Sequence, residues 1–224
     1  MAVMSRRSFL LSSLGVASLC LVGCGAKGAS GSAATTLAAA STSAAPSSSC
    51  VTSATGAYAS GTHHATIEVE GYGTIKLELD ADVAPVTVAN FAKLAGDGFY
   101  NGLTFHRIIS GFMVQGGDPN GNGTGGSSEK IVGEFSENGH PNSISHVRGT
   151  ISMARSQAYN SASSQFFIMQ ADTPSLDGQY AAFGHVTEGM DVVDAMCEAA
   201  HPTDNNGTIA AADQPRISSI SMDD

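Results

Sequence analysis

Residues 100–118 read YNGLTFHRIISGFMVQGGD. This stretch contains two apolar segments, residues 104–109 and 112–115, that are rich in Phe, Ile and Val. Only Ser110 and Gly111 separate them, and both residue types are frequent in turns. We therefore predict two short consecutive β-strands here, each bounded by turn-forming residues.

Further short strands and two helices are predicted on both sides of this stretch. Upstream, apolar and polar residues alternate over residues 66–79, which indicates a β-hairpin with one buried face. Pro85 then begins a helical pattern that ends near Gly96. Many short strands with two helices favour a mainly β domain, a closed antiparallel barrel rather than a parallel sheet. The remaining predicted elements are strands over residues 149–154, 165–169, 181–186 and 215–222 and a helix over residues 190–199.

Charge divides the 224 residues into two chemically different parts. All 20 acidic residues lie at or after Glu68, whereas residues 1–60 carry none and hold Arg6, Arg7 and Lys27. The rest of the chain therefore has 7 basic against 20 acidic residues, a net charge of −13. Because phosphate binding needs a positive surface, this balance argues against a nucleic-acid partner.

The first 23 residues have the pattern of a signal peptide. Arg6 and Arg7 precede an apolar segment, residues 9–22, that is too short for the roughly 20 residues that span a bilayer. Residues 5–10, SRRSFL, resemble a twin-arginine export signal. We therefore expect export without a membrane-spanning helix.

The end of this segment, residues 21–24, reads LVGC and resembles the lipobox of bacterial lipoproteins. Cleavage before Cys24 would leave that cysteine as a lipidated first residue, since its thiol is the nucleophile that takes the lipid. Acyl chains would hold the protein at the outer face of the bacterial cell membrane through the lipid alone. The alternative is an ordinary signal peptide with an unmodified cysteine.

Residues 24–62 are predicted to form a flexible tether before a folded domain at residues 63–224. Ala, Ser and Thr supply 26 of the 36 residues from 25 to 60, so little apolar surface is available for burial. Cys50 and Cys197 remain as cysteines of the exported form. Whether they pair is left open, because nothing in the sequence fixes the position of Cys50.

The stretch at residues 100–118 closely resembles the cyclophilin signature. Three further segments match the same family in order: residues 122–126 (NGTGG), 164–168 (SQFFI) and 176–186 (LDGQYAAFGHV). The resemblance covers residues 63–224. It implies a peptidyl-prolyl cis-trans isomerase on an eight-stranded antiparallel barrel with two capping helices. We expect a monomer that uses no metal or cofactor and acts on proline-containing polypeptides.

The reaction of such an enzyme requires few functional groups. Rotation about a peptide bond removes amide resonance and meets a barrier of about 18–20 kcal/mol. Before proline the two isomers are nearly equal in energy, so only the rate needs to change. An enzyme therefore needs a pocket for the proline ring and a donor where the twisted amide gains electron density.

The resemblance assigns these roles to particular residues. Arg107 corresponds to the catalytic arginine that donates to the prolyl nitrogen, and Gln115 to the residue that orients it. His106, next to Arg107 on the predicted strand, is expected to point to the opposite face and to be structural. The residues expected to bind substrate are Phe112, Met113, Phe167 and Leu176 in the proline pocket, Ala154 and Gln165 along the groove, and Tyr180 at the rim.

Two motifs in the glycine-rich segment point to other functions. Residues 121–126 satisfy the dinucleotide-binding pattern G-x-G-x-x-G, but no helix is predicted after them. Residues 118–129 satisfy the EF-hand calcium pattern, but a strand precedes them where a helix is needed. We expect a surface loop without a metal. The remaining rival to the isomerase is a non-catalytic module that binds extended Pro-containing segments.

Overall fold

The computed structural model describes residues 49–224 of the chain. The predicted signal peptide, the lipobox and Cys24 lie outside the described residues. Within this part of the chain, no helix is long and apolar enough to span a bilayer.

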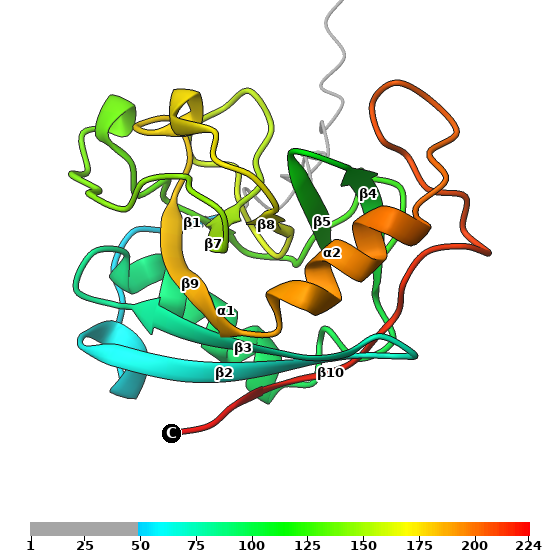
Figure 1. The fold of residues 1–224 in the computed structure, drawn as a ribbon. Coiled ribbons are helices and arrows are strands. Elements are labelled where there is room, and N and C mark those ends of the chain that lie inside the picture. Colours follow the sequence, from blue (N-terminus) through cyan, green and yellow to red (C-terminus); the bar gives the residue numbers. More distant parts are fainter. Residues whose placement is uncertain (1–48) are drawn as a thin grey trace, which may run out of the picture. The chain divides into compact units, whose positions relative to one another are not determined.

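Eight strands form one curled antiparallel sheet in the order β10-β2-β3-β9-β7-β8-β5-β4 (Figure 1). Helix α1 packs against β3 and β10, and α2 packs against β3, β4 and β5. The strands of the sheet are β2 (Thr62–Val69), β3 (Gly73–Asp80), β4 (Thr104–Ile109), β5 (Met113–Asp118), β7 (Thr150–Met153), β8 (Phe166–Met169), β9 (Ala182–Glu188) and β10 (Ile217–Met222). The other elements are β1 (Cys50–Val51), β6 (Lys130–Ile131), α1 (Pro85–Gly96), α2 (Met190–Ala199) and the 3₁₀ turns η1 (Ala57–Ala59), η2 (Ser136–Asn138) and η3 (Pro174–Leu176).

The sheet is a half-barrel, so the predicted closure of the barrel is wrong. Edge strands β4 and β10 meet only near their first residues, where Thr104 bridges to Arg216 and Ile217 N–H donates to Leu103 O at 2.8 Å. The loop after α2 occupies the rest of the β4 edge. Ile108 N–H donates to Gly207 O at 2.8 Å, and Ile209 N–H donates to His106 O at 3.0 Å. Because this loop already satisfies the edge of β4, β10 does not complete the ring.

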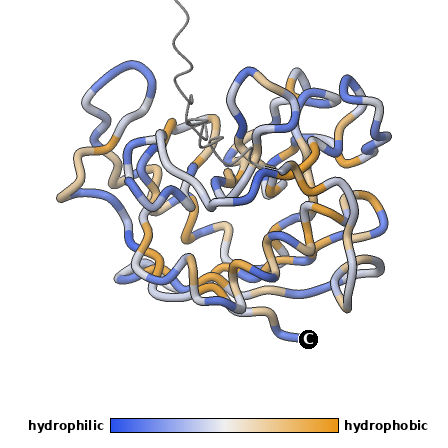
Figure 2. The backbone as a smooth tube through the Cα atoms, turned by 180° about the vertical axis from the view of Figure 1, so that it is seen from behind, coloured by the Kyte–Doolittle hydropathy of each residue, from blue (hydrophilic) through white to orange (hydrophobic). Residues whose placement is uncertain are grey.

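One core fills the inside of the sheet, and the predicted alternation is confirmed. In β2, Ala65, Ile67 and Val69 are buried while the residues between them are not. Figure 2 shows the hydrophobic stretches within strands and helices and hydrophilic stretches in the outer loops. The core centres on packed aromatic rings, those of Phe91, Tyr100, Phe105, Phe166 and Phe183.

Helix α1 begins without a side-chain cap of its own, since Ala84 stands at the N-cap. The carboxylate of Glu134, 4% exposed, takes that place from a distant part of the chain. It accepts the N–H groups of Val86 and Thr87 at 3.0 and 2.8 Å and the Thr87 hydroxyl at 2.7 Å. A negative group at a helix N-terminus satisfies free donors and opposes the positive end of the helix dipole.

The last part of the predicted tether, residues 49–61, packs on the domain instead of being flexible. Strand β1 pairs in parallel with β6, and Val132 N–H donates to Val51 O at 2.9 Å. The hydroxyl of Tyr58 donates to the carbonyl of Asp224 at 2.7 Å. A few apolar side chains anchor this segment, although its composition offers little apolar surface for burial. Cys50 and Cys197 are both free thiols.

Candidate active site

Eight of the nine predicted site residues line one cavity of about 220 Å³. Its walls come from β4, β5 and the turn between them, the start of the loop after β7, β8, the turn η3 and the segment before β9, so segments far apart in the sequence form one groove. The ninth residue, Gln165, lies next to the cavity and bonds to Gln115. The residues lining the cavity are Arg107, Phe112, Met113, Gln115, Ala154, Phe167, Leu176 and Tyr180, together with Arg155.

A β-bulge sets the position of Arg107. Phe105 pairs with Gly116 and Arg107 pairs with Gln115, so two steps along β4 match one step along β5 and His106 is the extra residue. Bulges redirect side chains, and they are frequent beside active sites. Here the bulge places Arg107 directly across from Gln115.

The guanidinium of half-buried Arg107 is held on two sides. Its Nη1 donates to Gln115 Oε1 at 3.2 Å, and its Nε donates to the backbone carbonyl of Asn206 at 2.7 Å. Burial lowers the pKa of Arg107 from its usual value. Because a guanidinium remains charged in proteins, the site contains a fixed, partly desolvated cation.

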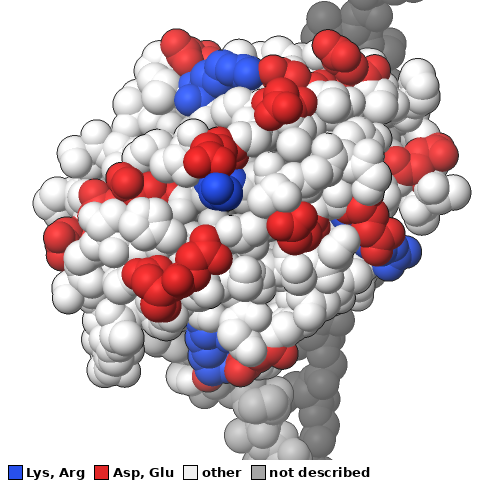
Figure 3. Space-filling view, turned by 60° about the horizontal axis from the view of Figure 1, so that its bottom comes forward, with Lys and Arg blue, Asp and Glu red and all other residues white. Residues whose placement is uncertain are grey.

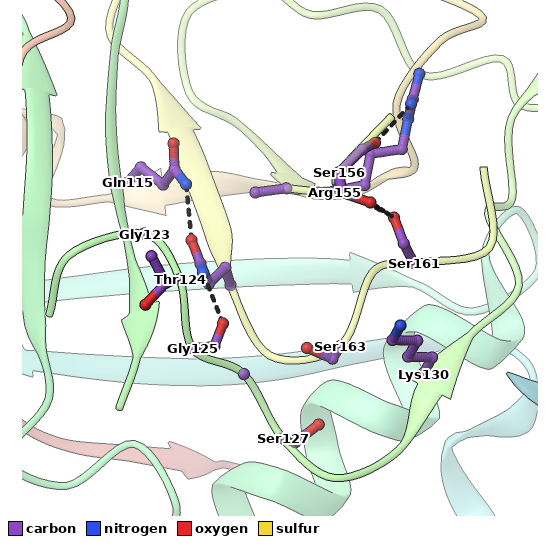
Figure 4. A pocket seen from close by; sticks show the side chains of 13 residues that line it. Gln115, Gly123, Thr124, Gly125, Ser127, Lys130, Arg155, Ser156, Ser161 and Ser163 are labelled. Carbon is purple, nitrogen blue, oxygen red and sulfur yellow. Dashed lines mark hydrogen bonds between the residues drawn. The ribbon is translucent and has the colours of Figure 1, made fainter. Parts of the chain in front are cut away.

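A relay of amides fixes which way Gln115 points. Its Nε2 donates to Gln165 Oε1 at 2.9 Å, and Gln165 Nε2 donates to Gly125 O at 2.8 Å (Figure 4). A carbonyl accepts only, so each amide in the relay has one consistent orientation. Gln115 must therefore present its oxygen to Arg107.

The apolar floor of the cavity is a small cluster separate from the main core. Met113, Phe167 and Met169 are its buried members, and Phe112, Leu176 and Tyr180 pack against them. On β8 the alternation sends Phe166 into the main core and Phe167 to the cavity. A flat apolar floor beneath one cation is suited to an apolar ring whose amide faces the cation.

His146 supports this floor from the side opposite the cavity, and no motif in the sequence marks it. Its ring stacks on Phe167 with centroids 6.0 Å apart. Nδ1 donates to Asp177 at 2.8 Å, since a carboxylate only accepts, and Nε2 therefore accepts from the Ser152 hydroxyl at 3.0 Å. Ser152 is completely buried, so this Ser-His-Asp arrangement has no exposed nucleophile and is structural.

A loop that the sequence analysis also missed holds Arg107 from the other side. The carboxylate of Asp204 accepts the N–H groups of Asn206 and Thr208 at 2.9 and 3.0 Å and the Thr208 hydroxyl at 2.8 Å. Gly207 lies between them with a φ of +87°. These bonds fix the Asn206 carbonyl that accepts from Arg107. A backbone acceptor is invisible to motif analysis, because any residue type supplies one.

Asp118, the first residue of the calcium pattern, binds the backbone of its own loop. Its carboxylate accepts the N–H groups of Asn120, Asn122 and Gly123 at 2.8, 3.1 and 2.6 Å. The carboxylate thus organises the glycine-rich loop. No cluster of three or more His, Cys, Asp or Glu side chains suited to a metal occurs among residues 49–224.

Two buried histidines predict a loss of stability in mild acid. Burial has the largest effect on the pKa of both His106 and His146 and lowers each below 6.5. The nearby carboxylates of Asp118 and Asp177 act in the opposite direction, but their effect is smaller. The unfolded chain then binds more protons below pH 6.5, so stability is full above 6.5 and falls as the pH drops toward the folded-state values. Urea midpoints should therefore fall between about pH 7 and about pH 5, before the carboxylates titrate. A flat profile over this range would contradict the assignment.

Comparisons with known proteins agree with this geometry. Residues 64–221 match the family model described as "Cyclophilin type peptidyl-prolyl cis-trans isomerase/CLD". The chain is 48% identical over 137 residues to a peptidyl-prolyl cis-trans isomerase of Helicobacter pylori, covering 60% of this chain and 80% of the relative. It is 45% identical over 128 residues to peptidyl-prolyl cis-trans isomerase B of Bacillus subtilis, covering 57% and 86%.

Solved structures extend the similarity to the fold. A cyclophilin type peptidyl-prolyl cis-trans isomerase of Cryptosporidium parvum superposes with a TM-score of 0.64 at 29% identity, covering 73% of this chain and 99% of that one. The same protein in the presence of the dipeptide Ala-Pro gives 0.63 at 30% identity, covering 72% and 99%.

Proposed function

This chain belongs to the cyclophilin-type peptidyl-prolyl cis-trans isomerases and is an enzyme of that kind, and we propose that it accelerates X-Pro rotation in exported proteins through Arg107. The observation that carries the mechanism is the guanidinium held above an apolar floor. The proline ring would lie on Phe167 and Met113, with its amide facing Arg107. No nucleophile, metal or proton transfer is needed for this reaction.

The donor works because the amide nitrogen changes during rotation. As resonance is lost, the prolyl nitrogen regains its lone pair and becomes a better hydrogen-bond acceptor. Nε and Nη1 of Arg107 are engaged by Asn206 and Gln115, whereas Nη2 has no protein acceptor among residues 49–224. A donation that is stronger in the twisted state than in either planar isomer lowers the barrier.

Gly207→Ala tests the positioning of Arg107 from outside the pocket. A Cβ at this residue would lie 2.7 Å from Ile108 O, in a backbone conformation that also disfavours side chains. The loop must shift and withdraw the Asn206 carbonyl, so kcat should fall by about tenfold to a hundredfold while KM changes little.

Gly139→Ala is the matched control for this variant, since Gly139 has a φ of +80° and nothing within 4 Å of its Cβ position. It carries similar backbone strain without touching the loop and should keep kcat. Equal kcat values for both variants would show that the Asn206 carbonyl does not position Arg107.

We also propose that the enzyme is a monomeric lipoprotein anchored through Cys24 at the outer face of the cell membrane. The support is the twin-arginine-like segment at residues 5–10 followed by LVGC at residues 21–24. Mass spectrometry of the mature protein should find an acylated Cys24 as the first residue. An unmodified N-terminus at another residue would contradict the anchor.

Refolding of a proline-limited substrate protein tests the proposed role. A small molar fraction of this enzyme should speed the slow refolding phase without changing the final yield of a reversible reaction. Binding to the unfolded substrate with no change in that phase would instead fit the non-catalytic module.

A further inference from the structure

A second, larger cavity adjoins the proline pocket. Its volume is about 340 Å³, and it shares Gln115, Ala154 and Arg155 with the smaller cavity. Figure 4 shows Gly123 and Thr124 on one side of it, with Lys130 and Ser163 across from them. A peptide whose proline occupies the first cavity therefore passes directly by the second.

The polar character of this cavity differs from that of the proline pocket. Hydroxyl groups and one ammonium group dominate its lining, and no carboxylate lines either cavity. Glu129, next to Lys130 in the sequence, lines a separate cavity beside α1. The hydroxyl and ammonium side chains of the second cavity are those of Thr124, Ser127, Lys130, Ser156, Ser161 and Ser163.

The distribution of basic residues singles out the same region. Of the seven Lys and Arg side chains in residues 49–224, four form ion pairs with carboxylates. Figure 3 shows basic side chains next to acidic ones on one face of the molecule. The four pairs are Lys76–Glu188, Lys93–Asp97, Arg148–Asp194 and Arg216–Glu70.

The other three basic residues, Arg107, Lys130 and Arg155, have no carboxylate within 4.0 Å among the described residues, and all three line the two cavities. Twenty acidic residues were available to pair with them. The unpaired positive charge of this acidic domain is thus gathered in the groove. Such a concave site focuses its potential on a bound ligand.

Lys130 and Arg155 differ in their freedom to meet a ligand. The guanidinium of Arg155 lies 4.8–5.1 Å from the ring centres of Phe135, Tyr159 and Tyr180 and donates to three backbone carbonyls. It points away from the middle of the second cavity in Figure 4. Lys130 is exposed and makes no hydrogen bond with its ammonium to the described residues. Lys130 is therefore the cation available for direct pairing.

We propose that the second cavity takes an acidic side chain of the substrate and that Lys130 makes the enzyme prefer X-Pro segments with Asp or Glu near the proline. This preference rests on the proposed function, because it concerns the same groove. Exposed ion pairs are weak, so we expect a preference of about threefold to fivefold in kcat/KM. Salt should reduce it, since the pair remains accessible to solvent.

The test uses matched X-Pro peptides with Glu or its neutral isostere Gln at successive positions on either side of the proline. At low salt, one position should show the Glu preference, and high salt should remove most of it. Equal kcat/KM values for Glu and Gln at every position would overturn the inference. Isomerisation of none of the peptides would instead overturn the proposed function, and the inference with it.

Lys130→Gln assigns the preference to one side chain. The ratio of Glu to Gln kcat/KM should fall to about one in this variant. Lys76→Gln removes the same charge from a residue that lines neither cavity, so its ratio should stay that of the wild type. A ratio that survives in Lys130→Gln, or that falls equally in both variants, would contradict the role of Lys130.

Discussion

Replacing Arg107 with alanine is expected to lower kcat/KM for X-Pro isomerisation by about 100-fold to 1,000-fold, the usual effect of removing one donor from a preorganised site. The loss should appear in kcat, because the donor acts on the twisted amide while the apolar floor binds the proline ring. Peptide affinity should change far less. A coupled isomerisation assay on one X-Pro peptide measures both quantities.

Two further variants make this prediction specific. Arg107→Lys keeps the charge, but one ammonium group cannot reach Asn206 and Gln115 and still donate to substrate, so its activity should be close to that of the alanine variant. Arg148→Ala removes an arginine whose guanidinium pairs with Asp194 on the surface, and it should keep full activity. An Arg107→Ala protein within about twofold of the wild type would contradict the mechanism.

Glu134→Ala is expected to destabilise the domain by about 3 kcal/mol, because it leaves two buried N–H groups and the Thr87 hydroxyl without their acceptor. It also removes the negative group at the start of α1. For a domain of this size the melting temperature should fall by roughly 6–12 °C.

Glu137→Ala is the control, since Glu137 is an exposed glutamate whose side chain meets only the Tyr159 hydroxyl, at 3.1 Å. Its effect should be within about 0.5 kcal/mol. Urea unfolding of both variants gives the comparison. Similar midpoints for both would show that Glu134 does not cap the helix.

Much of the fold was predictable because local patterns carry it. The strands around Ser110 and Gly111, the hairpin before Pro85 and both helices follow from alternation, helical spacing and turn residues, and the structure contains all of them. The bounds differ by a few residues, as in β5, which extends to Asp118. Boundaries depend on partners in the sheet, which a single segment does not specify.

The missed features depend on contacts between distant segments. The prediction of a closed barrel was wrong because the loop around Gly207 pairs with the edge of β4, and no local sequence pattern indicates this pairing. The packing of residues 49–61 was not predicted because the segment has few apolar residues. Two of them, Val51 and Tyr58, nevertheless pack against the core. Glu134 acts 48 residues away from Val86, so the cap of α1 was not visible in the helix sequence.

The site residues whose side chains belong to a sequence motif were predictable. The contributions of backbone groups and of supporting side chains outside the motif were not. The cavity brings together Arg107, Gln115 and the apolar side chains that the resemblance selected. The Asn206 carbonyl and the support from His146 beneath Phe167 were missed. The Asn206 carbonyl acts by holding Arg107 and His146 acts by stacking on Phe167, and neither residue belongs to a motif.

Exchange NMR on an X-Pro peptide observes the cis-trans rotation itself, without any coupled reaction. With a small molar fraction of the enzyme, exchange peaks between the cis and trans signals are expected within about a second, although the free peptide needs tens of seconds or longer. The peptide should remain covalently unchanged. Chemical-shift changes that report binding, with no exchange peaks at any enzyme concentration, would rule out isomerase activity and identify a binding module.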